Sequence, residues 1–268
     1  MNFAGKTAVV TGAASGIGRA ISRSLARRGC HLALADVNEA GLAETAALAA
    51  ASGLRISTHR LDVADRQAIA AFPAVVLTSH PGVDLLVNNA GVAVGGAFDQ
   101  VAEADFDWLI DINFWGVVRM SRAFLPLLKA SPEARLVNIS SLFGLIAPPG
   151  QTAYCASKFA VRGFSESLRH DLAGSSVGVT TVHPGGVATS IAKNARVPGA
   201  WSEAEQAQSQ ERLKRLLKLP PEQAGEIIVT GVEKDRPRII VGSDAKFASV
   251  LERLFPVSYW NFIGRGRE

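Results

Sequence analysis

The chain has 268 residues, of which 48% are hydrophobic and 19% are charged, and its formal net charge is +4. This composition excludes an intrinsically disordered chain, and the length fits one α/β domain with a single sizeable core. The basic residues are scattered along the chain, so no nucleic-acid partner is expected.

Apolar runs alternate with helix-like segments along the chain, which is typical of repeated βαβ units. Most of the apolar runs are unbroken, as in strands of a parallel sheet that helices cover on both faces. The predicted strands span residues 7–11, 31–35, 56–61, 85–88, 136–140, 179–183 and 238–241. The predicted helices span residues 16–28, 39–52, 65–79, 106–129, 152–174 and 221–234. Pro73 lies inside the third helix and lacks a backbone donor, so a break is predicted there.

Two segments carry no predicted strand. Residues 190–219 are rich in Ala, Gln, Glu and Lys, and we predict an inserted helical flap that serves as a lid. Residues 245–268 form a tail that mixes large apolar side chains with three arginines. Such a tail can lie on a membrane surface, but packing on its own core or on a neighbouring subunit is the more common arrangement and is the one expected.

The ends of the chain and its cysteines give no sign of export. The N-terminal residues MNFAGKTAVVTG contain no apolar stretch of signal-peptide length. Cys30 and Cys155 are far apart and stand in no metal-ligand spacing, which argues against a disulfide framework or a structural zinc. We therefore expect a cytoplasmic protein without a membrane span.

The first predicted strand runs into TGAASGIG, where Gly12, Gly16 and Gly18 precede a helix. Glycine permits a sharp turn and a close approach of the backbone to a pyrophosphate. The backbone N–H groups at the helix start, around Ser15 and Ile17, favour an anion. The spacing alone also describes an ordinary turn. The strand before it, the helix after it and an acidic residue further on favour nucleotide binding.

That acidic residue is Asp36, which closes the second predicted strand. A carboxylate there can accept hydrogen bonds from both hydroxyls of an adenosine ribose and would repel the additional phosphate of NADP. The next residue is Val37 rather than a basic residue, so NAD is favoured over NADP. Two alternatives stay open at this point: Asp36 could only cap the next helix, and Arg19 could reach a phosphate.

The segment YCASK places Tyr154 and Lys158 at positions i and i+4 of a predicted helix, and therefore on one face. An ammonium near a phenol lowers the phenol's pKa from about 10 toward neutrality, which allows a tyrosine to act as a general base. Alone, the pair is also typical of a solvated helix face. Ser140 and Ser141 end the fifth predicted strand, and since successive strand residues face opposite sides, only one of them should point into a given cleft.

Together these motifs resemble the short-chain dehydrogenase/reductase family from residue 5 to about residue 190. The matching segments, in the family's order and spacing, are TGAASGIG, LDV at 61–63, NNAG at 88–91, Asn113, ISS at 139–141, YCASK and PGGVAT at 184–189. The resemblance implies a single Rossmann-like domain over residues 1–268, a doubly wound parallel sheet of about seven strands. It also implies hydride transfer between NAD(H) and an alcohol or ketone, and a homodimer or homotetramer. The family's serine-to-tyrosine spacing selects Ser141 over Ser140.

The resemblance further implies roles for individual residues. Tyr154 would exchange the proton with the substrate oxygen, and Ser141 would hydrogen-bond that oxygen. Lys158 would bind the nicotinamide ribose and lower the pKa of Tyr154, while Asn113 would hold a water molecule of the proton relay. The residues expected to contact the cofactor are Gly12, Ser15, Gly16, Ile17, Gly18, Asp36, Asp62, Val63, Asn89, Gly91, Tyr154, Lys158, Pro184, Gly185, Val187 and Thr189.

The expected substrate cleft is apolar and has no arginine to bind a carboxylate or phosphate, which favours an uncharged, hydrophobic alcohol or ketone. Its expected lining comprises Val92, Ala93, Val94, Leu142, Phe143, Ile146 and Val187. Two alternatives remain. An NADP-dependent carbonyl reductase would share the chemistry and differ at Asp36. A non-catalytic NAD-sensing regulator would need the glycines and Asp36, but not the set of Ser141, Tyr154 and Lys158.

Overall fold

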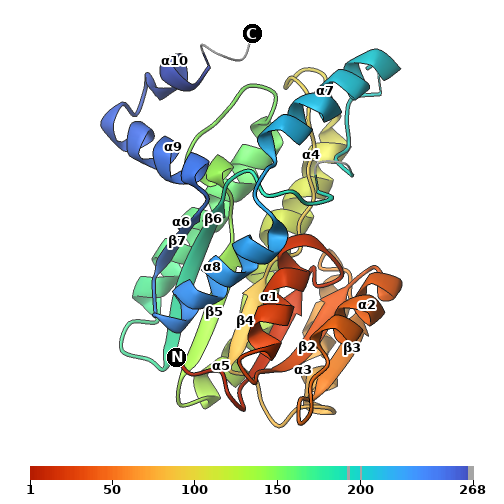
Figure 1. The fold of residues 1–268 in the computed structure, drawn as a ribbon, viewed down its shortest axis with the longest axis vertical. Helices are drawn as coiled ribbons and strands as arrows, with labels where there is room; N and C mark the ends of the chain where they lie inside the picture. Colours follow the sequence, from red (N-terminus) through yellow and green to blue (C-terminus); the bar gives the residue numbers. More distant parts are fainter. Residues whose placement is uncertain (192–193, 200, 265–268) are drawn as a thin grey trace.

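A computed structural model shows one sheet of seven parallel strands in the order β3-β2-β1-β4-β5-β6-β7 (Figure 1). The structure describes residues 1–191, 194–199 and 201–264, without the side chains of residues 209, 210 and 212–215. The strands are β1 Thr7–Thr11, β2 His31–Asp36, β3 Ile56–Arg60, β4 Leu85–Asn88, β5 Ala134–Ile139, β6 Val177–Pro184 and β7 Arg238–Val241. The predicted doubly wound parallel sheet is confirmed, and its strand order reverses between β1 and β4, where such sheets bind their ligands.

Helices cover both faces of the sheet. One apolar layer contains Ile21, Leu42 and Ile228, and the other contains Phe72 and Phe124. The helices of the first layer are α1 Gly16–Ala26, α2 Glu39–Ala49 and α8 Pro221–Glu233; those of the second are α3 Arg66–Leu77, α5 Gly116–Ala130 and α6 Thr152–Asp171. Because both faces are covered, every residue of β1 and β4 is buried, as the unbroken apolar runs indicate.

The predicted break at Pro73 is wrong, because α3 continues through this residue. Ile69, Phe72 and Val76 lie on one face of α3 and are buried in the second layer. Burying each large apolar side chain contributes about 1.5–3 kcal/mol, which offsets the backbone hydrogen bond that proline cannot make. The prediction considered only the hydrogen bond lost at Pro73 and could not include the tertiary contacts of α3.

The helix predicted over residues 106–129 is divided into three elements. They are α4 Glu103–Ile110, a π-helical turn at Asp111–Trp115, and α5. π-helical turns inside longer helices are rare and occur often at functional sites. This one contains Asn113.

The flap and the tail are both partly helical. The flap contains α7 Glu203–Leu216, and the tail contains α9 Ser243–Leu254 and α10 Tyr259–Ile263. Residues 192, 193 and 200 of the flap and 265–268 of the tail lie outside the described residues. Phe247 and Leu254 on α9 are 66% and 67% exposed, so the expected packing of the tail on its own core does not hold for them. Within the described part of the chain, no helix is long and apolar enough to cross a membrane.

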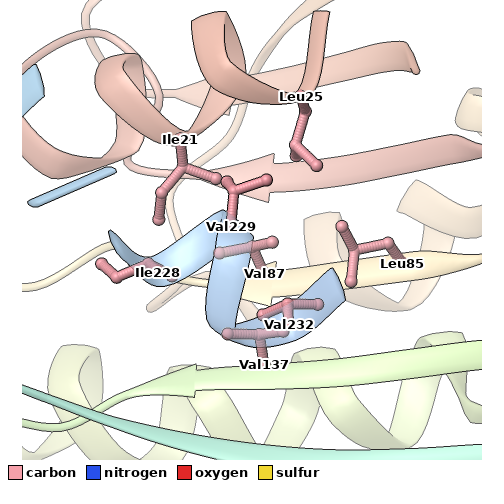
Figure 2. Close-up of a pocket in the computed structure, with 8 residues that line it drawn as sticks. All are labelled: Ile21, Leu25, Leu85, Val87, Val137, Ile228, Val229 and Val232. Atoms are coloured by element: carbon pink, nitrogen blue, oxygen red, sulfur yellow. The ribbon is translucent and has the colours of Figure 1, made fainter. Parts of the chain in front are cut away.

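A small void lies between the sheet and helices α1 and α8 (Figure 2). Its lining consists of Ile21, Leu25, Leu85, Val87, Val137, Ile228, Val229 and Val232. All eight side chains are aliphatic, so the void offers no polar group to orient a ligand. It belongs to the packing of the core.

Two histidines at the β3 edge predict a loss of stability in acid. Ser57 Oγ lies 2.7 Å from His59 Nε2 and 2.8 Å from His80 Nε2, and burial lowers the pKa of both imidazoles. The unfolded chain, with histidine pKa values near 6.5, therefore takes up protons before the folded protein does. Stability from this pair is complete above about pH 6.5 and is lost as the pH falls below that value.

We expect the free energy of unfolding, measured with urea, to fall between pH 7.5 and pH 5.5, and to fall less in H80Q. Glutamine cannot titrate, and its side-chain amide offers Ser57 a replacement hydrogen bond. An equal decrease in both proteins would contradict the role of His80.

Candidate active site

The turn between β1 and α1 is held against the end of β4. Asn89 Nδ2 donates to the carbonyl oxygens of Thr11 (3.0 Å) and Gly12 (3.1 Å). Thr11 Oγ1 accepts from the backbone N–H groups of Asn89 (3.0 Å) and Ala90 (3.1 Å). A Cβ at Gly18 would lie 2.1 Å from the carbonyl oxygen of Gly12. Position 18 therefore requires glycine for the packing of the turn itself. The side chain of Asn89 stabilises the turn through its two hydrogen bonds.

Asp36 lies beside this turn. Its carboxylate accepts from the backbone N–H groups of Ala14 and Asn38, both at 3.0 Å. The side chain of Asn38, and not that of Asp36, caps α2, which removes the first alternative left by the sequence. Arg19 pairs with Glu44 at 2.7 Å and also donates to the carbonyl of Ala14.

Asp62 and Val63 follow β3, next to β2 in the sheet. The carboxylate of Asp62 accepts from the N–H of Ala64 at 2.9 Å and is exposed. Val63 is buried, and a Cβ at Gly116 would lie 3.1 Å from it. The two residues thus differ in surroundings: Asp62 faces solvent at the strand end, and Val63 packs beneath the start of α5.

Asn113 is fully buried in the π-helical turn. Its Oδ1 accepts from the N–H of Val92 (2.8 Å), and its Nδ2 donates to the carbonyl of Val92 (2.9 Å) and to Ser157 Oγ (3.2 Å). A Cβ at Gly91 would lie 3.1 Å from Asn113 Oδ1 and 3.6 Å from Lys158 Nζ. Asn113 therefore joins the segment after β4 to α6, which carries Lys158.

The two serines after β5 point in different directions, as the alternation of strand residues predicts. Ser140 is buried, and its Oγ donates to the carbonyl of Lys158 at 2.8 Å. Ser141 is half-buried, and its hydroxyl interacts with that of Tyr154. A ring nitrogen of the buried His183, Nδ1, lies 3.0 Å from the carbonyl oxygen of Ser141. Ser141 is thus the serine beside Tyr154.

Tyr154 and Lys158 lie on one face of α6, with Lys158 Nζ 5.6 Å from the centre of the Tyr154 ring. Lys158 is 3% exposed, and Nζ donates to the carbonyl of Ile139 at 3.2 Å. Burial raises the pKa of Tyr154 to about 12, and the interaction with Ser141 opposes that rise. Burial also lowers the pKa of Lys158 to about 8. Desolvation disfavours the charged form of each group. The pKa of Tyr154 is therefore raised in the structure, whereas the sequence predicted that Lys158 would lower it.

The segment after β6 reaches back to the glycine turn. We call residues 184–189, PGGVAT, the PGG loop. A Cβ at Gly16 would lie 3.1 Å from the methyl group of Thr189, so the end of this loop touches the start of α1. Val187 is buried and pairs with Leu219 in an isolated β-bridge. The loop therefore lies between the glycine turn and Leu219, the last residue of the flap.

Arg196 attaches the flap to the segment after β4. Its backbone N–H donates to the carbonyl of Ala93 (3.0 Å), and its carbonyl accepts from Gly95 (2.9 Å). Its guanidinium lies 2.7 Å from Asp105 and 3.5 Å from the centre of the Trp108 ring. The flap is thus fastened to α4 at the rim of the site.

The apolar residues expected around the cleft fall into two groups. Val94, Ile146 and Val187 are buried and contribute to packing. Val92, Ala93, Leu142 and Phe143 remain half-buried beside Ser141 and Gly91.

The assembled groups fit a nicotinamide dinucleotide. Gly12 and Gly16 have φ angles of +65° and +52°, and they place the backbone turn at the start of α1, where N–H groups and the helix dipole favour a pyrophosphate. The carboxylate of Asp36 lies on one side of the turn, where a ribose of the dinucleotide would lie. Tyr154 and Lys158 lie on the other side, beyond the reversal of strand order.

Three supporting residues were missed in the sequence: Thr11, Ser157 and His183. Thr11 and Ser157 occur inside quoted motifs, so their positions could have drawn attention. His183 is the last residue of the sixth predicted strand, and no motif includes it. Its contact with Ser141 connects β6 to the residue after β5 and leaves no local pattern in the sequence.

Comparison with known proteins finds similar sequences and similar folds. The family model described as short chain dehydrogenase matches residues 6–198. SadH of Mycobacterium tuberculosis, an oxidoreductase by name, is 46% identical over 267 residues, covering 99% of this chain and 96% of that protein. A short-chain dehydrogenase/reductase of Burkholderia phymatum, solved in complex with NAD, has a TM-score of 0.87 at 33% identity and 95% coverage of both chains. A metagenomic short-chain oxidoreductase in complex with NADP has a TM-score of 0.72 at 30% identity, covering 90% of this chain and 98% of that one.

Proposed function

The chain belongs to the short-chain dehydrogenase/reductase family, and on that premise we propose that it transfers a hydride between NAD(H) and an uncharged, hydrophobic alcohol or ketone. One observation carries the proposal: the Ser141 hydroxyl, the Tyr154 phenol and the buried Lys158 ammonium lie together, next to the segment after β4 that holds the glycine turn. A nicotinamide cofactor, when bound, supplies or accepts the hydride.

In this proposal Tyr154 Oη exchanges the proton with the substrate oxygen. Ser141 donates a hydrogen bond to the same oxygen and stabilises charge that develops there. Lys158 Nζ binds the nicotinamide ribose and places a positive charge near the phenol. The side-chain amide of Asn113 is already bonded to Val92 and Ser157, so the relay water would be held by the backbone of the π-helical turn.

The pKa values bear on the direction of proton transfer. With its pKa raised to about 12, Tyr154 is protonated at neutral pH and ready to donate to a ketone oxygen. Alcohol oxidation requires the phenolate instead. The positive charge of an oxidised nicotinamide ring would favour that form.

NAD rather than NADP is proposed because of the groups around Asp36. Its carboxylate lies at the turn, where an additional phosphate on the ribose would be repelled. Arg19, the basic residue nearest in sequence to the turn, is paired with Glu44 and bonded to the carbonyl of Ala14, so its guanidinium already has partners in the protein. The NAD complex of the Burkholderia phymatum relative agrees with this preference, whereas the metagenomic relative binds NADP.

D36A tests the cofactor preference. We expect the variant to bind NADH about tenfold more weakly, since hydrogen bonds to a charged group contribute about 1.5–3 kcal/mol, and to discriminate less against NADPH. Titration of both cofactors by fluorescence measures this. E39Q, which removes an exposed charge at the start of α2, is the control and should keep the wild-type preference. Tighter binding of NADPH than of NADH by the wild-type protein would overturn the choice of NAD.

The substrate proposal rests on the half-buried apolar residues Val92, Ala93, Leu142 and Phe143. Secondary alcohols and ketones of rising chain length, followed by NADH absorbance, test it. We expect kcat/KM to rise with chain length and to stay low for carboxylated analogues. Cofactor binding without turnover of any of these compounds would instead indicate an NAD sensor.

We also propose that a single domain spans residues 1–268, with residues 190–219 as its lid, and that it assembles as a homodimer or homotetramer in the cytoplasm. Exposed aromatic side chains support a subunit interface on the helices that carry the site. Trp115 is 45% exposed and Phe159 is 39% exposed, a large apolar area to leave in water.

A further inference from the structure

The PGG loop is held on one side by the end of the flap. The carbonyl of Gly186 accepts from the backbone N–H groups of Lys218 (2.9 Å) and Leu219 (3.0 Å). The N–H of Ala188 donates to the carbonyl of Leu219 at 2.9 Å. These bonds resemble one rung of a parallel sheet. They attach the loop to a segment that itself follows the flap helix α7.

On its other side the loop is held by Asp244, in the first turn of α9. Asp244 Oδ2 accepts from the N–H of Gly186 at 2.7 Å, a short distance for such a bond. The first turn of a helix also favours a carboxylate, because the free N–H groups there carry partial positive charge. Asp244, which lies outside the family motifs of residues 11–189, thus anchors the PGG loop through its side chain.

The surrounding glycines make room for this carboxylate. A Cβ at Gly185 would lie 2.4 Å from both carboxylate oxygens of Asp244, and a Cβ at Gly242 would lie 2.4 Å from Oδ1. Gly242 has a φ of +98°, which other residues rarely adopt. Two glycines from separate strand ends therefore leave the space that Asp244 occupies.

Gly186, to which Asp244 is bonded, is close in sequence to residues proposed to contact the cofactor. Val187 follows Gly186 directly, and Thr189 touches Gly16 at the glycine turn. A shift of the Gly186 N–H would move Val187 with it, whereas the glycine turn is held separately by Thr11 and Asn89, and Asp36 belongs to β2. Asp244 should therefore influence the nicotinamide end of the cofactor and leave the adenosine end unaffected.

We propose that Asp244 is a positioning residue that fixes the PGG loop for binding of the nicotinamide half of the cofactor. This inference rests on the proposed function and on the family resemblance, which places Val187 and Thr189 at the carboxamide of the nicotinamide ring. Asp244 is exposed, so water can solvate the groups that its removal frees, and variants should still fold.

The test compares two ligands on D244A and D244N. NADH contains the nicotinamide, and ADP-ribose contains only the adenosine, pyrophosphate and second ribose. We expect D244A to bind NADH about tenfold more weakly, the lower end of what one charge-assisted hydrogen bond contributes, and to bind ADP-ribose as the wild type does. D244N keeps an oxygen acceptor for Gly186 and should recover most of the NADH affinity.

E252A, which removes a carboxylate from the same helix further along, is the matched control and should leave both affinities unchanged. Melting temperatures of all variants report folding. An equal loss of affinity for NADH and ADP-ribose in D244A, or no loss for either, would overturn the positioning role. A wild-type protein that binds neither ligand would refute the proposed function, and the inference with it.

Discussion

Y154F should lose turnover almost completely while it still binds NADH. The change removes only the phenolic oxygen, the atom proposed to exchange the proton. General acid–base groups contribute about 10²–10⁴-fold to rate, so kcat should fall by about a thousandfold or more. Steady-state turnover by NADH absorbance gives kcat, and fluorescence titration gives the NADH dissociation constant.

The surroundings of the Tyr154 ring should accept a phenylalanine without a change in packing. The Tyr154 ring packs edge-on against Phe143, with centroids 6.1 Å apart, and a phenylalanine can keep this contact. The protein has two tyrosines, so Y259F is a natural control. Tyr259 begins α10, and its Oη accepts from the N–H of Ala147 at 2.9 Å in an exposed contact, so its loss should have a small effect. Undiminished turnover in Y154F would exclude Tyr154 as the proton donor and acceptor.

G18A should abolish cofactor binding within the measurable range, a loss of about a hundredfold or more. A Cβ at Gly18 would lie 2.1 Å from the Gly12 carbonyl oxygen and 2.6 Å from Asn89 Nδ2. The Gly12 carbonyl belongs to the backbone, and the Asn89 amide is hydrogen-bonded to it. Neither group can make room for a methyl group unless the turn itself moves. Displacement of reacting or binding groups by about 1 Å can cost a hundredfold in function.

The same variant should also be less stable, since overpacking costs about 1–3 kcal/mol. Titration with NADH and thermal unfolding measure the two effects separately. G82A is the control, because a Cβ at Gly82 would meet nothing within 4 Å. Wild-type affinity in G18A would mean that the turn does not bind the cofactor.

The pKa values illustrate a property that depends on burial. The i, i+4 spacing of Tyr154 and Lys158 places them on one face of α6, and the structure agrees. Their spacing carries no information about desolvation, which raises the pKa of the tyrosine and lowers that of the lysine. The amount of protein packed around the two groups decides the direction of both shifts.

The sequence by itself was sufficient for the parallel sheet, for the glycine turn and for the prediction that Ser140 and Ser141 face different sides, whereas the choice of Ser141 needed the family resemblance. The first three depend on short-range regularities: unbroken apolar runs, the conformational freedom of glycine, and the alternation of side chains along a strand. Neighbouring residues impose such regularities wherever a segment lies in the fold. They are therefore visible before any distant contact is known.

Only the tertiary structure decided that α3 passes through Pro73, that Asn113 lies in a π-helical turn bonded to Val92, and that Asp244 reaches Gly186. In each case the deciding energy comes from partners distant in sequence, such as the apolar layer beneath α3 or a backbone N–H at the end of another strand. Local propensity measures what a segment prefers in isolation, whereas these features depend on which groups the folded chain brings together.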